Sequence, residues 1–372
     1  MKIAVIGPLE LPKAQGGVTR HCEEIYARVA SDGHDVTVLC AGGPSPDVTH
    51  RGMKIRHLRT ASGSGWERLT YALAASWAAT RGNYDVVHYH SFASSAFCFL
   101  PKLRRRRIVT TAHRIEWQDA KWGRVTRWFL RYCEWIALRC SDALIAVSQA
   151  LQDDLFTRDE RAAKIVVISN GVTRPDPVDP AALDALGLRP RAYLLVVGRL
   201  VPEKGVDVAI AAYLDLLRGG DIDVDLAIVG GSRKAGSTTE VALARQAEPA
   251  GERVHFLGVQ EPDVVAMLYD NAAALLAPSY QEGQPLVVAE AMRAGCCIVA
   301  SDIAAHLELV GDTARIFAAG DADALGRAIR WVLDHRDEAR TLGERGAARI
   351  AAGSYSWDEA AVATERVLSS TG

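Results

Sequence analysis

Short apolar runs alternate with helix-like segments along the chain, and this alternation constrains the fold more than any other feature. In the first half the runs are KIAVIG, DVTVLC, DVVHYH, RIVTTAH, ALIAVS and KIVVISN. Between the first two runs, Val18, Cys22, Ile25 and Val29 recur at the spacing of one helical face. Nearly continuous apolar strands that alternate with helices indicate a parallel sheet covered by helices, which is an α/β fold.

A proline-rich stretch at residues 173–191, TRPDPVDPAALDALGLRPR, interrupts the alternation. Such stretches mark loops and boundaries between domains. The alternation then restarts with YLLVVG, DLAIVG, VHFLG, ALLAP, CIVAS and ARIF, and the end of the chain, SYSWDEAAVATERVLSS, begins with a helix-capping signal. We predict a domain at 1–172, a linker at 173–190, a second domain at 191–352 and a last helix at 353–372, and a chain of 372 residues is long enough for two such domains.

The net charge of the chain says less about its partners than the distribution of charge along the sequence does. The net charge of −2 gives no reason to expect nucleic acid as a partner. Residues 1–175 hold 25 Lys and Arg against 16 Asp and Glu, and the rest holds 18 against 29, which gives +9 and −11. Either the first half meets an anionic ligand or the surface charge simply drifts along the chain.

The cysteines and the apolar runs bear on cellular location. Seven scattered cysteines without a CxxC pair are typical of reduced thiols in a cytoplasmic protein. The start, MKIAVIGPLE, has an apolar run of only four residues and reads as a first strand and not as a signal peptide. No stretch reaches the roughly 20 apolar residues that span a bilayer, so any membrane contact would be peripheral, at the inner face of the membrane.

Ligands of doubly wound sheets bind where strands end, and two consecutive units with a hinge imply a cleft, so residues that follow strands are the first candidates. In GPLELPKAQGGVTRH the strand ends at Gly7, and Gly16 and Gly17 open the first helix. Glycines let backbone N–H groups approach an anion at a helix N-terminus. The spacing is not GxGxxG, so no dinucleotide fingerprint is present, and an ordinary tight turn remains the alternative.

Two cations follow a strand in VVGRLVPEKG. Arg199 comes directly after the strand, and Lys204 opens the next helix. Two cations at the mouth of a parallel sheet can clamp a diphosphate and neutralise it as it leaves. Taken alone, the segment is better explained by two solvated surface charges.

Two glutamates lie around a predicted helix start in PSYQEGQPLVVAEAMRAG. Glu282 projects from the loop, Pro285 fits the first helical position, and Glu290 lies inside the helix. The backbone N–H groups near Gly283 and Gln284 could face a polar ligand, and each carboxylate can accept hydrogen bonds from hydroxyls. A helix-dipole carboxylate plus a surface glutamate is the alternative, weakened by the apolar sequence LVVAEAM around Glu290.

Together, these segments resemble the retaining glycosyltransferases of the GT4 family, which have the GT-B fold of two Rossmann-like domains facing a central cleft. The resemblance covers essentially the whole chain: the Gly-Gly loop, SNGV, GRLVPEKG, the E-x7-E stretch and the final helix, expected to pack back toward the first domain. It implies that Glu290 binds the ribose of a sugar nucleotide and that Arg199 and Lys204 bind the diphosphate. The implied sugar-binding and phosphate-approaching set is Glu282, Gly283, Gln284, Pro285 and Leu286, with Gly16 and Gly17 from the first domain. Glu282 is also a catalytic candidate, as a sugar binder in the first place and as the nucleophile of a double displacement in the alternative.

The chain departs from the family pattern at two places. The family often has Phe-Gly after the first motif Glu-Gly, whereas this chain has Gln284 and Pro285, which singles out Gln284 for donor preference. Thr173 replaces the acidic residue that commonly follows NGV, so no carboxylate role is carried over there.

The segment TTAHRIEWQDAKWGR places His113 directly after a strand. A lone histidine there is more often structural, but the resemblance implies a place beside the donor sugar and the acceptor, where an imidazole could orient or polarise the reacting hydroxyl. A subgroup associated with bacterial surface glycans and related glycosides makes Glu116, Trp117 and Asp119 candidates for the acceptor side.

The helix that follows is predicted to have two stripes. Val125, Phe129, Ile136 and Cys140 form the expected core face, and the other face is the basic and aromatic set Arg124, Trp128, Arg131 and Trp135. The second stripe suits an anionic lipid phosphate or a membrane surface, or else a solvated face with tryptophans packed on a neighbour. The run KLRRRRIV precedes its strand and therefore lies at the opposite end of the sheet.

The predicted reaction is transfer of a sugar from a nucleotide diphospho-sugar to a hydroxyl of a sugar, glycoside or lipid-linked acceptor, in synthesis of surface glycans or of glycosides. We expect no metal and no cofactor, because no DxD motif lies in a strand–loop context and no His/Cys cluster is visible in the sequence. The rival readings are an epimerase or phosphorylase of the same fold, a binding module without turnover, and a dehydrogenase, which the missing GxGxxG disfavours.

Overall fold

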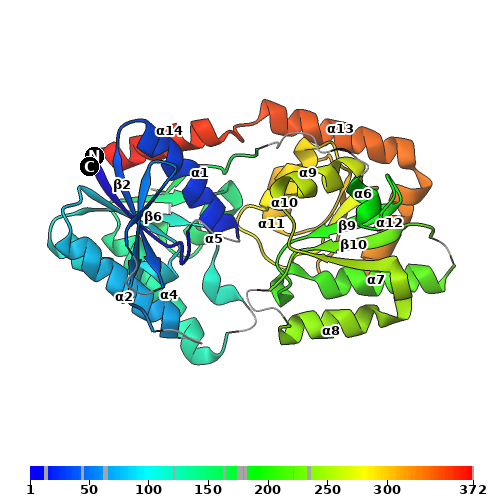
Figure 1. The fold of residues 1–372 in the computed structure, drawn as a ribbon, viewed down its shortest axis with the longest axis horizontal. Coiled ribbons are helices and arrows are strands. Elements are labelled where there is room, and N and C mark those ends of the chain that lie inside the picture. Colours follow the sequence, from blue (N-terminus) through cyan, green and yellow to red (C-terminus); the bar gives the residue numbers. More distant parts are fainter. Residues whose placement is uncertain are drawn as a thin grey trace. The chain divides into compact units, whose positions relative to one another are not determined.

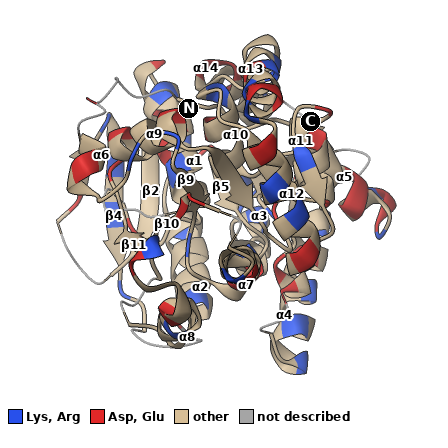
Figure 2. Cartoon of the chain, turned by 90° about the vertical axis from the view of Figure 1, so that its right-hand side faces the viewer, with Lys and Arg blue, Asp and Glu red and all other residues tan. Residues whose placement is uncertain are grey.

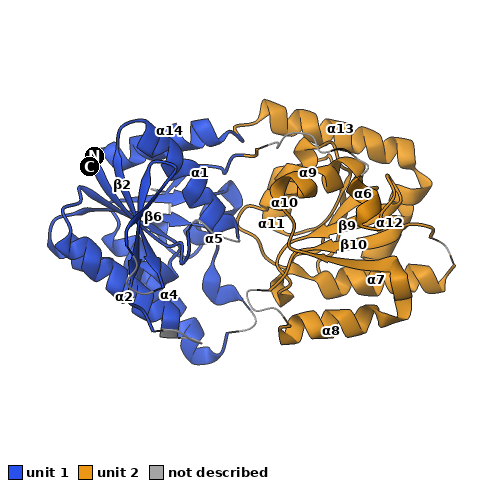
Figure 3. Ribbon diagram, in the orientation of Figure 1, with its two compact units in different colours: residues 1–171, 355–372 blue, residues 172–354 orange. Residues whose placement is uncertain are grey.

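The computed structural model describes residues 1–11, 16–42, 46–61, 66–119, 122–161, 165–173, 179, 182–220, 222–232 and 236–370. It forms two compact units (Figure 3). Unit 1 comprises Met1–Gly171 and Tyr355–Gly372, and unit 2 comprises Val172–Ser354. The C-terminal end of the chain therefore belongs to the same unit as its beginning.

Unit 1 is built on a sheet whose described strands run in the order β3-β4-β2-β1-β5-β6-β7-β8. The pairs are parallel except for β3 and β4, which are antiparallel. Central strands such as β1 and β5 are buried on both faces, as the apolar runs predict. The strands are β1 (Lys2–Ile6), β2 (Asp35–Ala41), β3 (Val48–His50), β4 (Met53–Leu58), β5 (Val86–His90), β6 (Arg107–Ala112), β7 (Ala143–Ala146) and β8 (Ile165–Val167).

The helices of unit 1 cover both faces of this sheet (Figure 1). Helices α1 and α14 pack against one another, and α2 and α4 both pack on the 3-10 segment η1. Helix α1 buries Cys22, Ile25 and Val29, most of its predicted stripe, while Val18 is only half-buried. The elements are α1 (Gly17–Ser31), α2 (Trp66–Arg81), η1 (Ala93–Phe97), α3 (Phe99–Leu103), η2 (Glu116–Gln118), α4 (Arg124–Cys140), α5 (Gln149–Phe156) and α14 (Trp357–Ser369).

Helix α14 is joined to unit 1 by packing and by hydrogen bonds. The hydroxyl of Ser356 caps it by accepting from the backbone N–H groups of the second and third residues that follow. Trp357 is buried against Gly171, where a Cβ would lie 2.2 Å from the tryptophan backbone nitrogen. Arg28 of α1 donates to Asp358 at 2.5 Å. The SNGV segment thus has a glycine where the last helix approaches the backbone most closely.

Unit 2 is a parallel sheet whose described strands run in the order β11-β10-β9-β12-β13-β14. Its core joins sheet residues such as Leu194 and Leu226 to helix residues such as Tyr213 and Ile329. The strands are β9 (Tyr193–Val197), β10 (Asp225–Val229), β11 (Val254–Gly258), β12 (Ala274–Ala277), β13 (Ile298–Ser301) and β14 (Arg315–Phe317). The helices are α6 (Ala182–Ala185), η4 (Pro202–Lys204), α7 (Val206–Arg218), α8 (Thr238–Ala247), η5 (Glu248–Arg253), α9 (Pro262–Asn271), α10 (Leu286–Arg293), α11 (Ala304–Val310), α12 (Ala322–Asp334) and α13 (Arg336–Ala352).

The segment predicted as a linker, 173–190, is described only in part. Residues 174–178 and 180–181 lie outside the described residues. The remainder includes the short helix α6, and Leu183 and Leu188 are fully buried in unit 2. Apolar side chains in this proline-rich stretch therefore join its second half to the unit that follows.

Each sheet has a point where the strand order changes direction. In unit 1, β1 pairs with β2 on one side and β5 on the other, and in unit 2, β9 pairs with β10 and β12. The crevice beyond the carboxyl ends of such a strand pair is where open α/β sheets bind ligands. Several candidate residues follow these strands: Gly16 and Gly17 come after β1, Arg199 and Lys204 after β9, and Glu282 after β12.

Candidate active site

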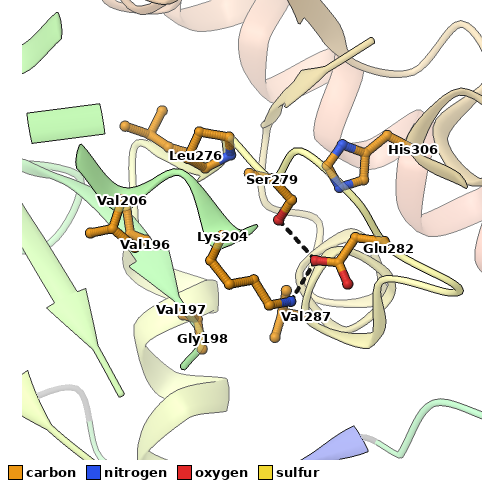
Figure 4. A pocket seen from close by; sticks show the side chains of 12 residues that line it. Val196, Val197, Gly198, Lys204, Val206, Leu276, Ser279, Glu282, Val287 and His306 are labelled. Carbon is orange, nitrogen blue, oxygen red and sulfur yellow. Dashed lines mark hydrogen bonds and ion pairs between the residues drawn. The ribbon is translucent and has the colours of Figure 1, made fainter. Parts of the chain in front are cut away.

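A pocket opens in unit 2 at the carboxyl ends of β9 and β12 (Figure 4). The pocket is small, with a cavity volume of about 10 Å³, and it opens to solvent. Its charged and polar side chains are Lys204, Ser279, Glu282 and His306. The apolar and backbone lining comes from Val196, Val197, Gly198, Val206, Leu276, Ala277, Pro278 and Val287.

An ion pair between Lys204 and Glu282 lies in this pocket (Figure 4). The two side chains are only 18% and 13% exposed, and the hydroxyl of Ser279 also donates to Glu282 at 2.8 Å. Gly205 makes the approach possible, because it has φ +63° and a Cβ there would lie 2.1 Å from the oxygen of Pro278. The structure therefore brings together two predicted site residues that are 78 positions apart in the chain.

The environment of Glu282 keeps its carboxylate charged. Burial by itself would raise the pKa of Glu282, but the charge and hydrogen bond of Lys204, with smaller contributions from His306 and Ser279, bring the pKa below its ordinary value. A carboxylate that is ionised near neutral pH accepts hydrogen bonds and is a poor proton donor. The pair also means that each charge is compensated by the other before any ligand enters.

His306 of α11 completes the pocket wall, and the sequence analysis missed it. Its Nδ1 lies 3.1 Å from the backbone oxygen of Ser301, which can only accept, so the proton is on Nδ1. Nε2 is buried and has no hydrogen-bond partner. Burial lowers the pKa of His306 despite the nearby charge of Glu282. A signal was present, because His306 follows the strand CIVAS at the same sheet edge as the other candidates.

The remaining predicted donor residues lie around this pocket or beyond it. Arg199 follows β9, and its half-exposed guanidinium lies 3.9 Å from the carboxylate of Glu203. Glu290 is the fifth residue of α10, and the hydroxyl of Tyr269 on α9 donates to it at 3.3 Å. Neither of the two lines the pocket itself.

The helix start after Glu282 differs by one residue from the prediction. Helix α10 begins at Leu286, and Pro285 is the capping residue, with φ −80° and ψ 86°. Pro285 was predicted at the first helical position, but its ψ is far from helical, so the helix cannot include it. Gly283 and Pro285 are buried and Gln284 is half-buried, so of the three only Gln284 presents part of a side chain to solvent.

Unit 1 has a histidine cluster at the corresponding sheet edge. His90 ends β5, His113 follows β6, and His21 comes from the second turn of α1. Nδ1 of His90 lies 3.2 Å from Nε2 of His113, and the ring of His21 meets the ring of His113 edge-on at 4.7 Å between centroids. Gly7, the first residue after β1, lies so close to His90 that a Cβ on it would be 2.6 Å from the Cβ of His90. Burial lowers the pKa of His113 well below its ordinary value, so the ring is neutral.

The predicted Gly-Gly loop is described only at its end. Gly16 caps α1 with φ +120°, and nothing lies within 4 Å of a Cβ built there. Gly17 is the first residue of α1, four positions before His21. Residues 12–15, which precede them, lie outside the described residues.

Each of the three residues predicted for the acceptor side has a partner within unit 1. Glu116 is buried and accepts from the backbone N–H of Ala93 at 3.2 Å. Burial raises the pKa of Glu116, although the charges of nearby arginines lower it in part. Asp119 forms a two-point ion pair with Arg114 at 3.1 and 2.9 Å. The indole N–H of Trp117 donates to a glutamate of α4 at 3.0 Å. These side chains belong to the segment after β6, and these contacts hold that segment within unit 1.

Helix α4 uses the predicted core face only in part. Its buried residues are Leu130, Cys133, Glu134, Ala137 and Leu138, whereas Val125, predicted for the core, is 82% exposed. Phe129, Ile136 and Cys140 are half-buried and pack against the hydrophobic core of unit 1. The predicted stripe therefore meets the core from Phe129 onward and is exposed at its first residue, Val125.

The other stripe of α4 is exposed, as predicted. Trp128 and Trp135 are 71% and 47% exposed, and Lys and Arg residues mark the length of the helix in Figure 2. We call this the α4 surface: Arg124, Val125, Arg127, Trp128, Arg131, Trp135 and Arg139. Among the helices of the described residues, no helix is long and apolar enough to cross a membrane.

Comparison with known proteins adds relatives and fold neighbours. The family model for Glycosyltransferase Family 4 matches residues 15–174, and that for Glycosyl transferases group 1 matches residues 185–349. Glycogen synthase of Mycobacterium tuberculosis is 30% identical over 99% of this chain and 94% of the relative. Phosphatidyl-myo-inositol mannosyltransferase of Mycolicibacterium smegmatis is 28% identical over 90% and 85%. HepE of Anabaena, solved in complex with UDP and glucose, superposes with a TM-score of 0.81 at 21% identity, covering 100% of both chains.

Proposed function

Because this chain belongs to the family 4 glycosyltransferases and has their GT-B fold, we propose that it moves a sugar from a nucleotide diphospho-sugar to an acceptor hydroxyl, with retention and without a metal ion. The observation that carries this proposal is the charged Lys204–Glu282 pair at the switch point of unit 2. A nucleotide sugar offers the two complements of this pair, a diphosphate for the cation and hydroxyls for the carboxylate.

On the donor side, Lys204 and Arg199 stabilise the negative charge that develops on the departing diphosphate. This is the step for which other transferases use a metal ion, and two cations beside one strand end offer the same compensation. Glu282 accepts hydrogen bonds from the sugar hydroxyls. Glu290 accepts from the ribose, and the backbone of Gly283 to Leu286 contributes N–H donors at the start of α10.

Gln284 is proposed to help choose the donor sugar. Of the three residues before α10, Gly283 has no side chain and Pro285 has a closed ring, so Gln284 alone carries a side chain that can turn toward a ligand. It also lies two positions after Glu282. A polar side chain there would distinguish sugars that differ in a single hydroxyl, because an unpaired buried polar group is costly.

On the acceptor side, neutral His113 orients the attacking hydroxyl. An imidazole whose pKa lies far below neutral keeps a lone pair for a hydroxyl proton and places no positive charge beside the sugar cation that forms during transfer. Gly16 and Gly17 are proposed to approach the phosphate or the sugar from unit 1.

The acceptor is proposed to include sugars or glycosides presented on a lipid. The α4 surface places arginines beside exposed tryptophans, the composition that binds anionic membrane interfaces. The relative from M. smegmatis is, by its name, a mannosyltransferase of phosphatidyl-myo-inositol. A reducing cytoplasmic compartment is supported by the seven cysteines, all of which are unpaired thiols.

The donor screen tests the main proposal. The purified chain is treated with a chelator and incubated separately with UDP-, GDP-, ADP- and dTDP-sugars, and both binding and nucleotide release are measured. Binding and slow release with at least one donor are expected. Failure to bind any of the four would contradict the proposal, whereas binding without release in the presence of any acceptor would leave a sugar-nucleotide-binding module.

Membrane contact is tested by sedimentation with vesicles that contain phosphatidylserine. Trp128→Ala should reduce the bound fraction, because it removes an exposed ring from the α4 surface. The matched control is Phe156→Ala on α5, whose ring is 50% exposed in the same unit but lies outside that surface. Equal binding by both variants would remove α4 from the contact.

A further inference from the structure

The three histidines at the sheet edge of unit 1 offer more than an oriented base. One ring nitrogen from each of His21, His90 and His113 lies within 4.8 Å of the other two. The three rings come from α1, from the end of β5 and from the residue after β6, so the sheet topology gathers them. His21 and His90 are at least 98% buried, and His113 is 9% exposed. The cluster is thus enclosed, with one partly open side at His113.

The tautomer of His21 is set by its surroundings. Its Nδ1 lies 2.6 Å from the amide oxygen of Asn170, which can only accept, so Nδ1 carries the proton. Nε2 then has a free lone pair, and this buried atom has no hydrogen-bond partner. A buried acceptor without a partner is costly and calls for an explanation. The orientation is the one found in metal sites, where the second ring nitrogen donates to an oxygen and directs the first at the ion.

His90 can adopt the matching tautomer. Its Nε2 lies 2.8 Å from the hydroxyl oxygen of Tyr26, which also lies 2.5 Å from Nδ1 of His88. If His90 donates to Tyr26, the tyrosine hydroxyl donates to His88, and His88 donates through Nε2 to Thr111 at 2.8 Å. The protons on Nε2 of His90, on the Tyr26 hydroxyl and on Nε2 of His88 then each have an acceptor, and Nδ1 of His90 has a free lone pair directed toward His113.

We propose that His21 Nε2, His90 Nδ1 and His113 Nε2 form a binding site for a divalent transition metal ion of the Zn²⁺ class. Imidazole nitrogens suit Zn²⁺, Co²⁺, Ni²⁺ and Cu²⁺ and do not suit Mg²⁺ or Ca²⁺. Zn–N bonds of about 2.0–2.1 Å in a tetrahedron place the nitrogens about 3.3 Å apart. The His90–His113 separation of 3.2 Å already fits. The ligand nitrogen of His21, which lies within 4.8 Å of the other two, has to approach them by at most about 1.5 Å.

Binding requires no oxidant or reductant, only a change of tautomer at one ring. The proton shared between Nδ1 of His90 and Nε2 of His113 leaves that position and resides on the other nitrogen of its ring. The three nitrogens leave a fourth position for water or an anion, as in open zinc sites.

The ion would inhibit transfer, and this consequence rests on the proposed function. Once Nε2 of His113 is bound to metal, the ring has no lone pair for an acceptor hydroxyl. The chain would therefore transfer sugar without metal and lose activity when Zn²⁺ fills the site.

Cobalt binding tests the site without using the enzyme reaction. Untagged, chelator-treated protein is titrated with Co²⁺, and the visible d–d absorption of a four-coordinate ion is followed, with Zn²⁺ as competitor. We expect one Co²⁺ per chain, displaced by one Zn²⁺. Absence of a visible band in the presence of excess Co²⁺ would overturn the site, whatever the outcome of the donor screen.

Variants assign the ligands. His21→Asn keeps a donor for Asn170 and removes Nε2, so Co²⁺ should bind more than tenfold more weakly. Asn170→Ala should weaken binding by about 10- to 100-fold, as is usual when the hydrogen-bond partner that orients a metal ligand is removed. His57→Gln is the matched control, because its buried Nδ1 also lacks a partner but it belongs to β4, away from the cluster. Circular dichroism establishes folding, and His113→Asn replaces His21→Asn if that variant does not fold. A folded ligand variant with unchanged affinity would refute the assignment, and Zn²⁺ that binds at the cluster without slowing transfer would refute the inhibition alone.

Discussion

At the switch point of unit 2, the side chains that meet are a lysine and a glutamate, whereas at the switch point of unit 1 they are three histidines. Both sets are largely buried, and both follow parallel strands. In unit 2 the neighbours keep the glutamate ionised, and in unit 1 burial keeps the imidazoles neutral. One topology therefore supports two electrical environments, one suited to a charged leaving group and the other to an uncharged hydroxyl.

The largest expected effect comes from removing the cation of unit 2. Lys204→Met should lower kcat by about 100- to 1,000-fold, the usual cost of deleting a group that stabilises charge in the transition state. Its control is Lys102→Met, because Lys102 also forms an ion pair, with Asp142, but at an exposed place on unit 1. Steady-state kinetics with the preferred donor decide the matter. Similar kcat values for the two variants would mean that the buried pair is structural.

A second change tests how the pair of unit 2 is held. Gly205→Ala should lower the free energy of unfolding by more than about 3 kcal/mol, because positive φ and a Cβ 2.1 Å from Pro278 combine strain with collision. Gly236→Ala is the matched control, with φ +70° and nothing within 4 Å of its Cβ, and it should cost only about 1 kcal/mol. Chemical denaturation measures both. Equal losses would show that the contact with Pro278 is relaxed easily.

Acidification should destabilise unit 1 at a higher pH than unit 2. Unfolded His21 takes up a proton near pH 6.5, but the folded residue does so only near pH 4. The free energy of unfolding is therefore unaffected by His21 above pH 6.5 and falls as the pH drops toward 4, by up to about 3 kcal/mol. His88, His90 and His113 act in the same direction in unit 1, and among the described residues of unit 2 His306 does so. Glu282, whose pKa is lowered, destabilises unit 2 only below the ordinary carboxylate range.

Hydrogen exchange between pH 7 and pH 4, followed by mass spectrometry, resolves this order. Peptides of α1 and β5 should lose protection at a higher pH than peptides of α10 and β12. Earlier loss in unit 2 would contradict the assignment of neutral imidazoles to unit 1.

The smallest effect is expected at the ribose end of the donor site. Glu290→Gln should weaken donor binding by about 10- to 100-fold, the range for hydrogen bonds to a charged group, and should leave the melting temperature nearly unchanged. The amide oxygen can still accept from Tyr269, so the local packing is kept. Isothermal titration with the donor and with the free nucleotide provides the measurement. An unchanged affinity for both would remove Glu290 from the site.

The fold could be predicted because its signals are local. Apolar runs of strand length, separated by helical periodicity, are enough to indicate a parallel sheet, and the parallel pairing of β1, β2 and β5 confirms that reading. The exposed Val125 at the start of the predicted core face of α4 shows where such signals fail. Both stripes of that helix are partly apolar, and periodicity cannot tell which turns extend beyond the sheet.

The site could be predicted only where a motif names its residues. Glu282 and Lys204 stood out in their own segments, but their ion pair is a contact across 78 positions that no local pattern contains. His21 lies beside the apolar stripe of α1, and His90 ends the strand DVVHYH, so each reads as an ordinary member of its element. The cluster exists only because the strand order brings β5, β6 and α1 to one edge.

The packing of Trp357 against Gly171 has a consequence for how the chain folds during synthesis. Unit 1 needs helix α14, and α14 follows all of unit 2 in the chain. The ribosome therefore delivers a contiguous unit 2 before the last piece of unit 1, so the half that is translated first is finished last. Until then the site for Trp357 and the face of α1 that meets α14 are exposed on the nascent chain, and that surface is where chaperones would act.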